Sequence, residues 1–161
     1  MSDSFDRFRQ QISNATRFRL FLLTKLPSAF FAGLKMISMN REQASVKVRY
    51  QWFNRNPFGS MYFAVQSMAA EMATGLLASG YVYKHSPAIS MLVTGIEAKF
   101  AKRITGTAIF TCADGLAIGK TINEAVETGE ARTIACRSVG RNDIDETVSE
   151  FMITWSFKVR R

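Results

Sequence analysis

One segment, NRNPFGSMYFAVQSMAAEMATGLLASG at residues 54–80, constrains the fold more than any other part of the sequence. It opens with a turn that contains Pro57 and Gly59 and continues as a run of small and apolar residues. Ser60 is the expected N-cap of a helix that ends near Gly80, although Asn56 could begin the turn instead. The run has almost no polar face. A helix that is apolar nearly all round is a buried helix, so we predict that it lies at the centre of the molecule.

The segments around this helix alternate between apolar and polar residues, which is typical of half-buried strands. Residues 45–52 place Val46, Val48, Tyr50 and Trp52 on one side, and residues 34–40 are the expected hairpin partner. Four more alternating stretches cover residues 88–103, 105–113, 131–139 and 147–160, and residues 114–130 have helical spacing. This order predicts an α+β fold in which an antiparallel sheet curls around one long central helix. We expect a single domain over residues 1–161, with residues 1–33 as an N-terminal helical extension of one or two short helices packed on it.

The chain is basic, with 21 Lys and Arg against 13 Asp and Glu, a net charge of +8. This charge favours anionic partners, but the sequence has no zinc-finger spacing and no RNA-recognition signature, so we expect no nucleic-acid partner. The N-terminal apolar runs are interrupted by Lys25 and Pro27, so any membrane contact would be peripheral, through Phe30, Phe31 and Leu34. Two cysteines, Cys112 and Cys136, lie in strand-like runs and are interpreted as reduced core thiols of a cytoplasmic protein.

The buried helix carries one charged residue, Glu71. On a helical projection it lies in a stripe of small or mildly polar residues: Ser60, Ala64, Ser67, Glu71, Thr74, Gly75 and Ala78. A buried carboxylate needs a partner or its pKa rises, and no cation stands three or four residues away. Glu71 is therefore either a hydrogen-bonded structural residue, with Ser67 or Thr74 as partner, or a general base or nucleophile in a cleft.

The segment NPFGSMYFAVQSMAAEMATG resembles the central motif of the hotdog-fold acyl-CoA thioesterases, most closely the phenylacetate-type enzymes and their uncharacterised relatives. That motif reads Asn, a Gly-containing turn, His-Gly-Gly at the helix start and then an acidic residue. Asn56 and Glu71 stand at the matching positions, whereas Tyr62, Phe63 and Ala64 replace His-Gly-Gly. The order of strands and helices after Gly33 also agrees, so the resemblance covers most of the chain and implies the hotdog fold.

The resemblance implies a hydrolase for acyl thioesters of coenzyme A or of a carrier protein, with no other cofactor. The sequence has no cluster of metal ligands, so we expect no metal site. It makes Glu71 the base or nucleophile, the Phe63 backbone N–H the oxyanion donor, Asn56 a group that orients the thioester or its water, and Ser90 an assisting serine. The candidate substrate-binding residues are Gly59, Tyr62, Ser67 and Thr74 around the helix, and Lys99, Lys102 and Arg103, which would meet the phosphates of coenzyme A or lie at a solvated strand end.

Phe63 and Glu71 cannot serve one carbonyl within one chain, because eight residues of helix separate them by roughly 12 Å. A two-fold axis between antiparallel helices brings Glu71 of one copy beside Phe63 of the other, so we expect a homodimer or a dimer of dimers. Histidine-based chemistry has only His85 to draw on, which we interpret as a loop residue. Two alternatives stay open: a non-catalytic hotdog protein that binds acyl-CoA or a fatty acyl group, and a basic module for membrane or nucleic acid.

Overall fold

The computed structural model describes residues 2–160 of the chain. Helices and strands follow in this order: α1 Ser2–Ser13, α2 Ala15–Lys25, α3 Pro27–Ala32, β1 Lys35–Met39, β2 Ala44–Arg49, the short 3₁₀ helix η1 Trp52–Asn54, α4 Phe63–Val82, β3 Ile89–Phe100, β4 Thr107–Cys112, α5 Gly115–Thr128, β5 Arg132–Asn142 and β6 Thr147–Val159. The strands and the two later helices occur in the predicted order.

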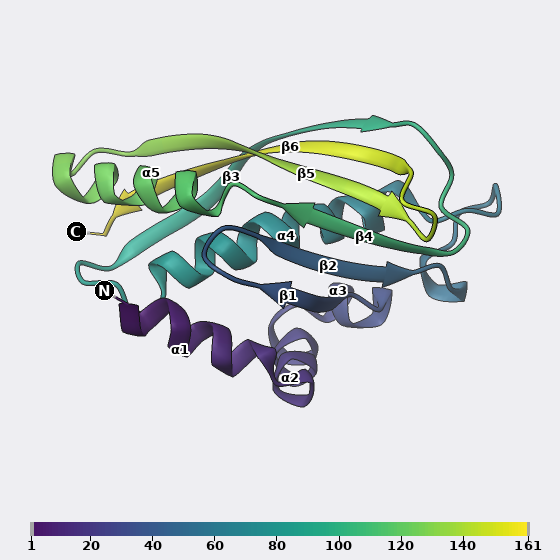
Figure 1. The fold of residues 1–161 in the computed structure, drawn as a ribbon, viewed down its shortest axis with the longest axis horizontal. Helices are drawn as coiled ribbons and strands as arrows, with labels where there is room; N and C mark the ends of the chain where they lie inside the picture. The colour runs from purple at the N-terminus through teal and green to yellow at the C-terminus, as the bar shows by residue number, and fades with distance from the viewer. Residues whose placement is uncertain (1, 161) are drawn as a thin grey trace.

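The strands form one six-stranded sheet in the order β1-β2-β4-β5-β6-β3, and every neighbouring pair is antiparallel. Figure 1 shows the sheet curling over α4, with α1 to α3 on the side of α4 that faces away from it. The fold class is therefore α+β, as predicted. The two outer strands are β1 and β3, so β3 presents one unpaired edge.

The central helix α4 is buried along most of its length, which confirms the prediction from its missing polar face. Its fully covered residues include Ala69, Ala70, Ala73 and Leu77. Small side chains let the sheet and the helix approach closely, and the strands supply the large residues, such as Phe110 and Phe157. The strand prediction also holds for Val46 and Val48, which are both fully buried.

Three local predictions were wrong. Trp52 was placed on the buried side of a strand, but β2 ends at Arg49 and Trp52 is 74% exposed at the start of η1. The N-cap of the central helix is Tyr62 and not Ser60, because Met61 N–H donates to the Ile104 carbonyl and Met61 forms an isolated bridge with Arg55. These contacts hold the chain extended until Tyr62. The N-terminal segment forms three helices, where one or two were expected.

The N-terminal helices contain no span of membrane length; no helix within residues 2–160 is long and apolar enough to cross a bilayer. Of the three side chains expected to meet a membrane, Leu34 is buried and Phe30 is half-buried, so only Phe31 is exposed. Cys112 and Cys136 are free thiols buried between the sheet and its covering helices, as predicted for core residues.

Candidate functional site

A groove of about 500 Å³ lies at the N-terminal end of α4. One wall is the loop before the helix, a second is the first turn of α4, and the third is the chain that leaves β3. Its lining residues are Asn56, Pro57, Phe58, Ser60, Met61, Tyr62, Phe63, Gln66, Phe100, Ala101, Lys102 and Arg103. The structure thus brings together five residues that the sequence marked as candidates: Asn56, Tyr62, Phe63, Lys102 and Arg103.

The turn before α4 is organised by the side chain of Asn56. Its Oδ1 accepts hydrogen bonds from the N–H of Phe58 at 2.9 Å and of Ser60 at 3.1 Å. Its Nδ2 donates to Ser60 Oγ at 3.0 Å. Gly59 has a φ of +73°, the left-handed region that favours glycine, and it lies outside the groove lining. Asn56 therefore shapes this wall, and its contact with a thioester or water stays a prediction.

The first turn of α4 presents free backbone donors to the groove. Tyr62 is the N-cap but makes no side-chain cap. Within residues 2–160 the Phe63 and Ala64 N–H groups donate to no acceptor, because the first N–H groups of a helix have no partner inside it. The helix dipole adds positive character here, so the groove can stabilise negative charge. The aromatic rings of Tyr62 and Phe63 stand beside these donors, 4.8 Å apart between centroids.

Glu71 lies two turns further along α4 and does not line the groove of its own chain. Burial raises the pKa of its carboxyl above the usual value. Its carboxylate forms no hydrogen bond and no ion pair with the residues that the structure describes. Gly75, one turn on, leaves room for it: a Cβ at that position would be 3.1 Å from Glu71 Oε1.

The hydroxyls near Glu71 are used elsewhere. Ser67 Oγ donates to the Phe63 carbonyl at 3.0 Å, and Thr74 Oγ1 donates to the Glu71 backbone carbonyl at 2.8 Å. Thr74 Oγ1 also accepts a hydrogen bond from Trp155 Nε1 at 2.8 Å, a buried contact between α4 and β6. Neither hydroxyl therefore donates a hydrogen bond to the Glu71 carboxylate, so Ser67 and Thr74 are not its structural partners.

The three cations of the predicted phosphate cluster separate in space. Lys102 and Arg103 line the groove, and Lys102 also forms an ion pair with Glu146, whose pKa it lowers. Lys99 lies on the exposed part of β3, opposite Glu150, away from the groove lining.

Ser90 also lies apart from the groove. It is at the beginning of β3, where its Oγ donates to the Lys158 carbonyl at 3.0 Å. Its neighbour Met91 contacts Ser79 in the last third of α4, so this part of β3 runs beside the far end of the helix. The structure does not bring Ser90 to the Phe63 N–H.

Gln66 and Phe100 are among the groove residues that sequence reasoning missed. Gln66 is a buried amide whose Oε1 has no partner among the described residues, while its Nε2 donates to the Met61 carbonyl at 3.4 Å. A glutamine in a helix with almost no other polar residue was the available signal. Phe100 was hidden by a β-bulge between Val93 and Gly95, which shifts the alternation of β3 and turns Ile96, Ala98 and Phe100 toward the α4 side.

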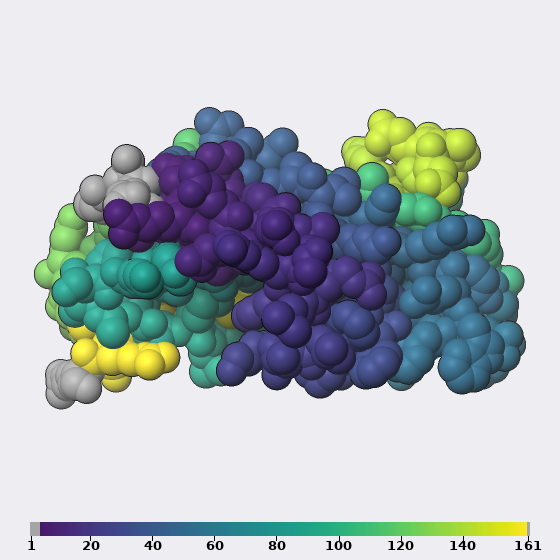
Figure 2. Space-filling model, turned by 90° about the horizontal axis from the view of Figure 1, so that it is seen from below, coloured from purple at the N-terminus to yellow at the C-terminus, as the bar shows by residue number. Residues whose placement is uncertain are grey.

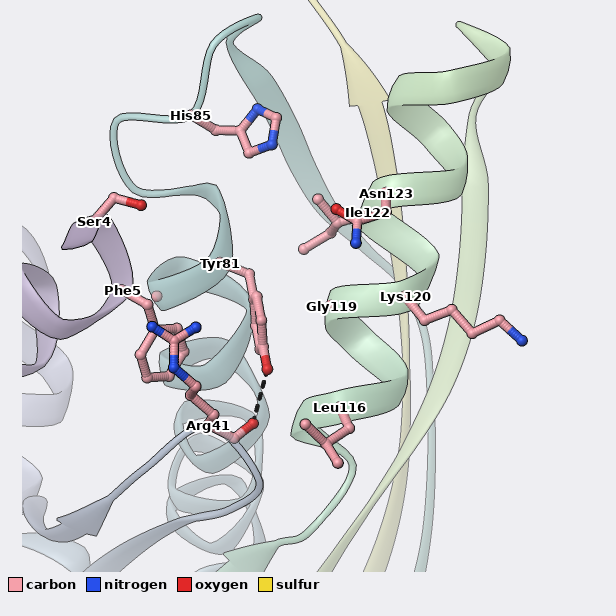
Figure 3. A pocket seen from close by; sticks show the side chains of 11 residues that line it. Ser4, Phe5, Arg41, Tyr81, His85, Leu116, Gly119, Lys120, Ile122 and Asn123 are labelled. Carbon is pink, nitrogen blue, oxygen red and sulfur yellow. Dashed lines mark hydrogen bonds between the residues drawn. The ribbon is translucent and has the colours of Figure 1, made fainter. Parts of the chain in front are cut away.

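A second cavity, of about 350 Å³, lies at the opposite end of α4 (Figure 3). It holds His85, whose Nδ1 is 2.9 Å from the Pro87 carbonyl, and Tyr81, whose hydroxyl donates to the Arg41 carbonyl at 3.0 Å. Burial raises the pKa of Tyr81. None of the predicted site residues lines this cavity. Within residues 2–160 no group of three or more His, Cys, Asp or Glu side chains is placed to hold a metal ion.

The fold is shared with several solved structures. A Pseudomonas aeruginosa protein of unknown function, described as a probable thioesterase, has a TM-score of 0.75 at 18% identity, over 90% of this chain and 96% of that one. A Chlorobaculum tepidum protein of unknown function has a TM-score of 0.78 at 17% identity, over 94% of this chain and 97% of that one. A Haemophilus influenzae thioesterase has a TM-score of 0.63 at 10% identity, over 87% of this chain and 88% of that one. A search of curated proteins found no match.

Identities this low carry information on the fold alone, and that fold, an antiparallel sheet curled around one long helix, is the hotdog fold. The model of the family described as a domain of unknown function, DUF4442, matches residues 15–157, and the chain therefore belongs to the DUF4442 family.

Proposed function

We propose that this protein hydrolyses acyl thioesters of coenzyme A or of a carrier protein, at a site built from two copies of the chain. The observation that carries the proposal is Glu71: a half-buried carboxylate with a raised pKa and no partner among the described residues. Keeping such a group in an apolar helix has a cost in stability, and that cost is explained if the carboxylate reacts. The likeness to structures named as thioesterases supports the same reaction class.

The second copy supplies what one chain lacks. Phe63 and Glu71 are separated by roughly 12 Å along α4, too far for one carbonyl to reach both. In a two-fold dimer with antiparallel α4 helices, the Glu71 of one copy lies beside the Phe63 N–H of the other. The free edge of β3 favours this assembly, because an exposed edge of 12 residues is a template for pairing with another strand. Its inward-facing Ile96 and Phe100 are about half exposed in the single chain.

In the proposed reaction the ionised Glu71 acts on the thioester carbonyl in one of two ways. It removes a proton from a water that attacks the carbon, or it attacks the carbon itself and forms an anhydride that water then hydrolyses. In both, the carbonyl oxygen becomes negative and accepts a hydrogen bond from the Phe63 N–H at the positive end of α4. The C–S bond breaks, and the thiolate leaves and takes up a proton.

The groove fits the leaving group in this scheme. Lys102 and Arg103 stand at its rim, where phosphates of coenzyme A or of a phosphopantetheine arm would find charge-assisted hydrogen bonds. The apolar strip on β3 (Ile96, Ala98 and Phe100) lies on the α4 side of the sheet and offers a surface for the acyl chain.

The test is Glu71→Gln, which keeps the shape and most of the hydrogen-bonding capacity of the side chain. We expect kcat for acyl-CoA hydrolysis, followed by free thiol release, to fall by about 10²–10⁴-fold, the usual contribution of a positioned acid–base group. The oligomeric state by sedimentation and the binding of acyl-CoA by calorimetry should persist. A kcat close to that of the wild type would remove Glu71 from the chemistry. Single-turnover hydrolysis in H₂¹⁸O can establish the anhydride route, because label enters Glu71 only when water attacks the Glu71 carbonyl of an anhydride.

A second candidate function is binding of acyl-CoA without turnover. The observation that favours it is the pair of aromatic rings at the helix start, where Phe63 is 54% exposed beside the proposed oxyanion donor. A bulky ring there would hinder the approach of a carbonyl. Micromolar binding of acyl-CoA, with no thiol released by the wild type from any acyl length, would establish this function in place of hydrolysis.

A further inference from the structure

The positive charge of this protein is concentrated in its first 70 residues. They contain 10 basic residues (Lys and Arg) and 3 acidic residues (Asp and Glu). The remaining residues contain 11 basic and 10 acidic residues. Between Asp6 and Glu42 the sequence has no acidic residue at all. Almost all of the net charge of +8 therefore belongs to residues 1–70, where α2 carries +3, β2 +2 and β1 +1, and Arg55 after η1 adds one more.

Within this region α2 presents an apolar stripe to solvent. Its inner face is Phe18 and Leu22, both buried. At about 100° per residue, Leu20 and Leu23 lie on the opposite side, and Leu20 is 61% exposed. Arg17 and Arg19 flank this outer stripe on its two sides, about 100° from Phe18 in either direction. A helix with an exposed apolar stripe between cations is typical of segments that lie in a membrane interface.

Exposed apolar side chains also stand on α3 and η1, and α2 contacts α3 through Arg19, whose guanidinium lies over the Phe30 ring at 4.9 Å. Phe31 is 52% exposed, and its ring is 5.8 Å from that of Phe53 in η1. Gln51 Nε2 donates to the Phe31 carbonyl at 3.2 Å and ties the two elements together. Trp52 projects from the same short helix, with the Arg55 guanidinium over its ring at 6.0 Å. Figure 2 views the molecule from the side of the N-terminal helices. Their purple and indigo atoms cover the middle of the surface in view, and the blue segment after β2 adjoins them on the right.

The charges on this face decide among its possible occupants. Arg17, Arg19, Lys25 and Arg55 form no ion pair within residues 2–160. A two-fold contact between copies through this face would set cations against the same cations, with no acidic residue of α2 or α3 to neutralise them. Nucleic acid would meet the cations but would leave Leu20 and Leu23 in contact with phosphates and water. A bilayer with anionic lipids matches both the cations and the apolar side chains.

We propose that the face formed by α2, α3 and η1 docks on an anionic membrane surface, with α2 lying in the plane of the interface. Leu20, Leu23 and Phe31 enter the boundary between headgroups and acyl chains, where apolar area is removed from water. Arg17 and Arg19 remain at the depth of the lipid phosphates and bind them by charge-assisted hydrogen bonds. The assignment does not depend on thioester hydrolysis.

The test is flotation of the full chain with vesicles of phosphatidylcholine alone and of phosphatidylcholine with phosphatidylglycerol. We expect binding to the anionic vesicles only, and weaker binding at high salt. Two double variants divide the face: Leu20→Ser with Leu23→Ser, and Arg17→Gln with Arg19→Gln. Each should weaken the partition coefficient by about tenfold. Thermal melting checks that each variant folds.

Matched controls come from outside the face. Leu116→Ser with Ile144→Ser removes two exposed apolar side chains, and Lys120→Gln with Lys158→Gln removes the same charge as the arginine pair. Both should float like the wild type. Absence of binding to anionic vesicles, or an equal loss in the two charge variants, would overturn the proposal. A lower oligomeric state of the Leu20 and Leu23 variant in sedimentation without lipid would assign the face to contacts between copies, which also overturns it.

Discussion

The carboxylate of Glu71 lies against the bare backbone of Gly75, one helical turn away, so that a Cβ on residue 75 would be 3.1 Å from Glu71 Oε1. The same Cβ would also be 3.3 Å from Trp155 Cζ2. Trp155 cannot give way easily, because its Nε1 is hydrogen-bonded to Thr74. The long Glu71 side chain is therefore the group that an added methyl would displace.

Gly75→Ala should accordingly lower thioesterase activity more than stability. Alanine favours a helix interior over glycine by about 1 kcal/mol, which offsets the crowding. A displaced carboxylate should reduce kcat by roughly tenfold or more, since small misplacements of a reacting group are costly. The measurement is kcat together with thermal melting. In the double variant with Glu71→Gln, Gly75→Ala should cause no further loss; additive losses would show that the two residues act independently.

The raised pKa of Glu71 predicts a pH-dependent stability difference between the wild type and Glu71→Gln. The usual value of the glutamate pKa is 4.5, and burial raises it in the folded protein. Well below that value the carboxyl is protonated in both folded and unfolded states. As pH rises through the folded pKa, the wild type must keep a desolvated charge, so this contribution to its free energy of unfolding is lost.

Glu71→Gln carries no charge at this position. The difference in Tm, variant minus wild type, should therefore increase as pH rises from about 4.5 through the raised pKa of Glu71. Melting curves across this pH range are the check, and a constant difference would contradict the assignment. If the reaction needs ionised Glu71, the acid limb of kcat/KM should lie above the usual glutamate pKa as well.

The groove separates the roles of the cations at the end of β3 and just after it. Arg103 lines the groove, whereas Lys99 stands outside it, so Lys99→Ala serves as the matched control for Arg103→Ala. We expect Arg103→Ala to raise KM for acyl-CoA several-fold with little change in kcat, and to leave an acyl-pantetheine substrate unaffected, since that substrate has no phosphates. Steady-state kinetics on both substrates tests this. Equal effects on the two substrates would mean that Arg103 does not contact the nucleotide.

The hydrogen bond from Trp155 to Thr74 joins α4 to β6 in the core. Thr74→Val keeps the shape but leaves the buried indole N–H without an acceptor, which should lower the free energy of unfolding by about 1–3 kcal/mol. Thr74→Ser retains the hydroxyl and should recover most of that loss. Urea denaturation of the three proteins measures the difference. Equal stability of the valine and serine variants would argue that the hydrogen bond contributes nothing.

The sequence by itself determined the six strands, the two later helices and their order. The run from Met61 to Gly80 has no polar face, so it had to be the buried central helix, and alternation in the six strands had to place one face of each on that helix. These periodicities are local, so they predict the type of each element without knowledge of the segments that pack against it. The candidates Asn56 and Glu71 were also available from the sequence, because their spacing matched a known motif.

Only the tertiary structure decided which residues meet. The bulge between Val93 and Gly95 reverses the faces of β3 and brings Phe100 to the groove, whereas unbroken alternation from Ile89 would have placed Lys99 on that face. Trp52 continues an alternating pattern but is exposed, because β2 ends three residues earlier. The central helix begins at Phe63, later than the sequence predicts, because Met61 N–H donates a hydrogen bond to the carbonyl of Ile104, which is distant in the sequence. Each outcome depends on contacts between segments far apart in the chain, which local sequence does not encode.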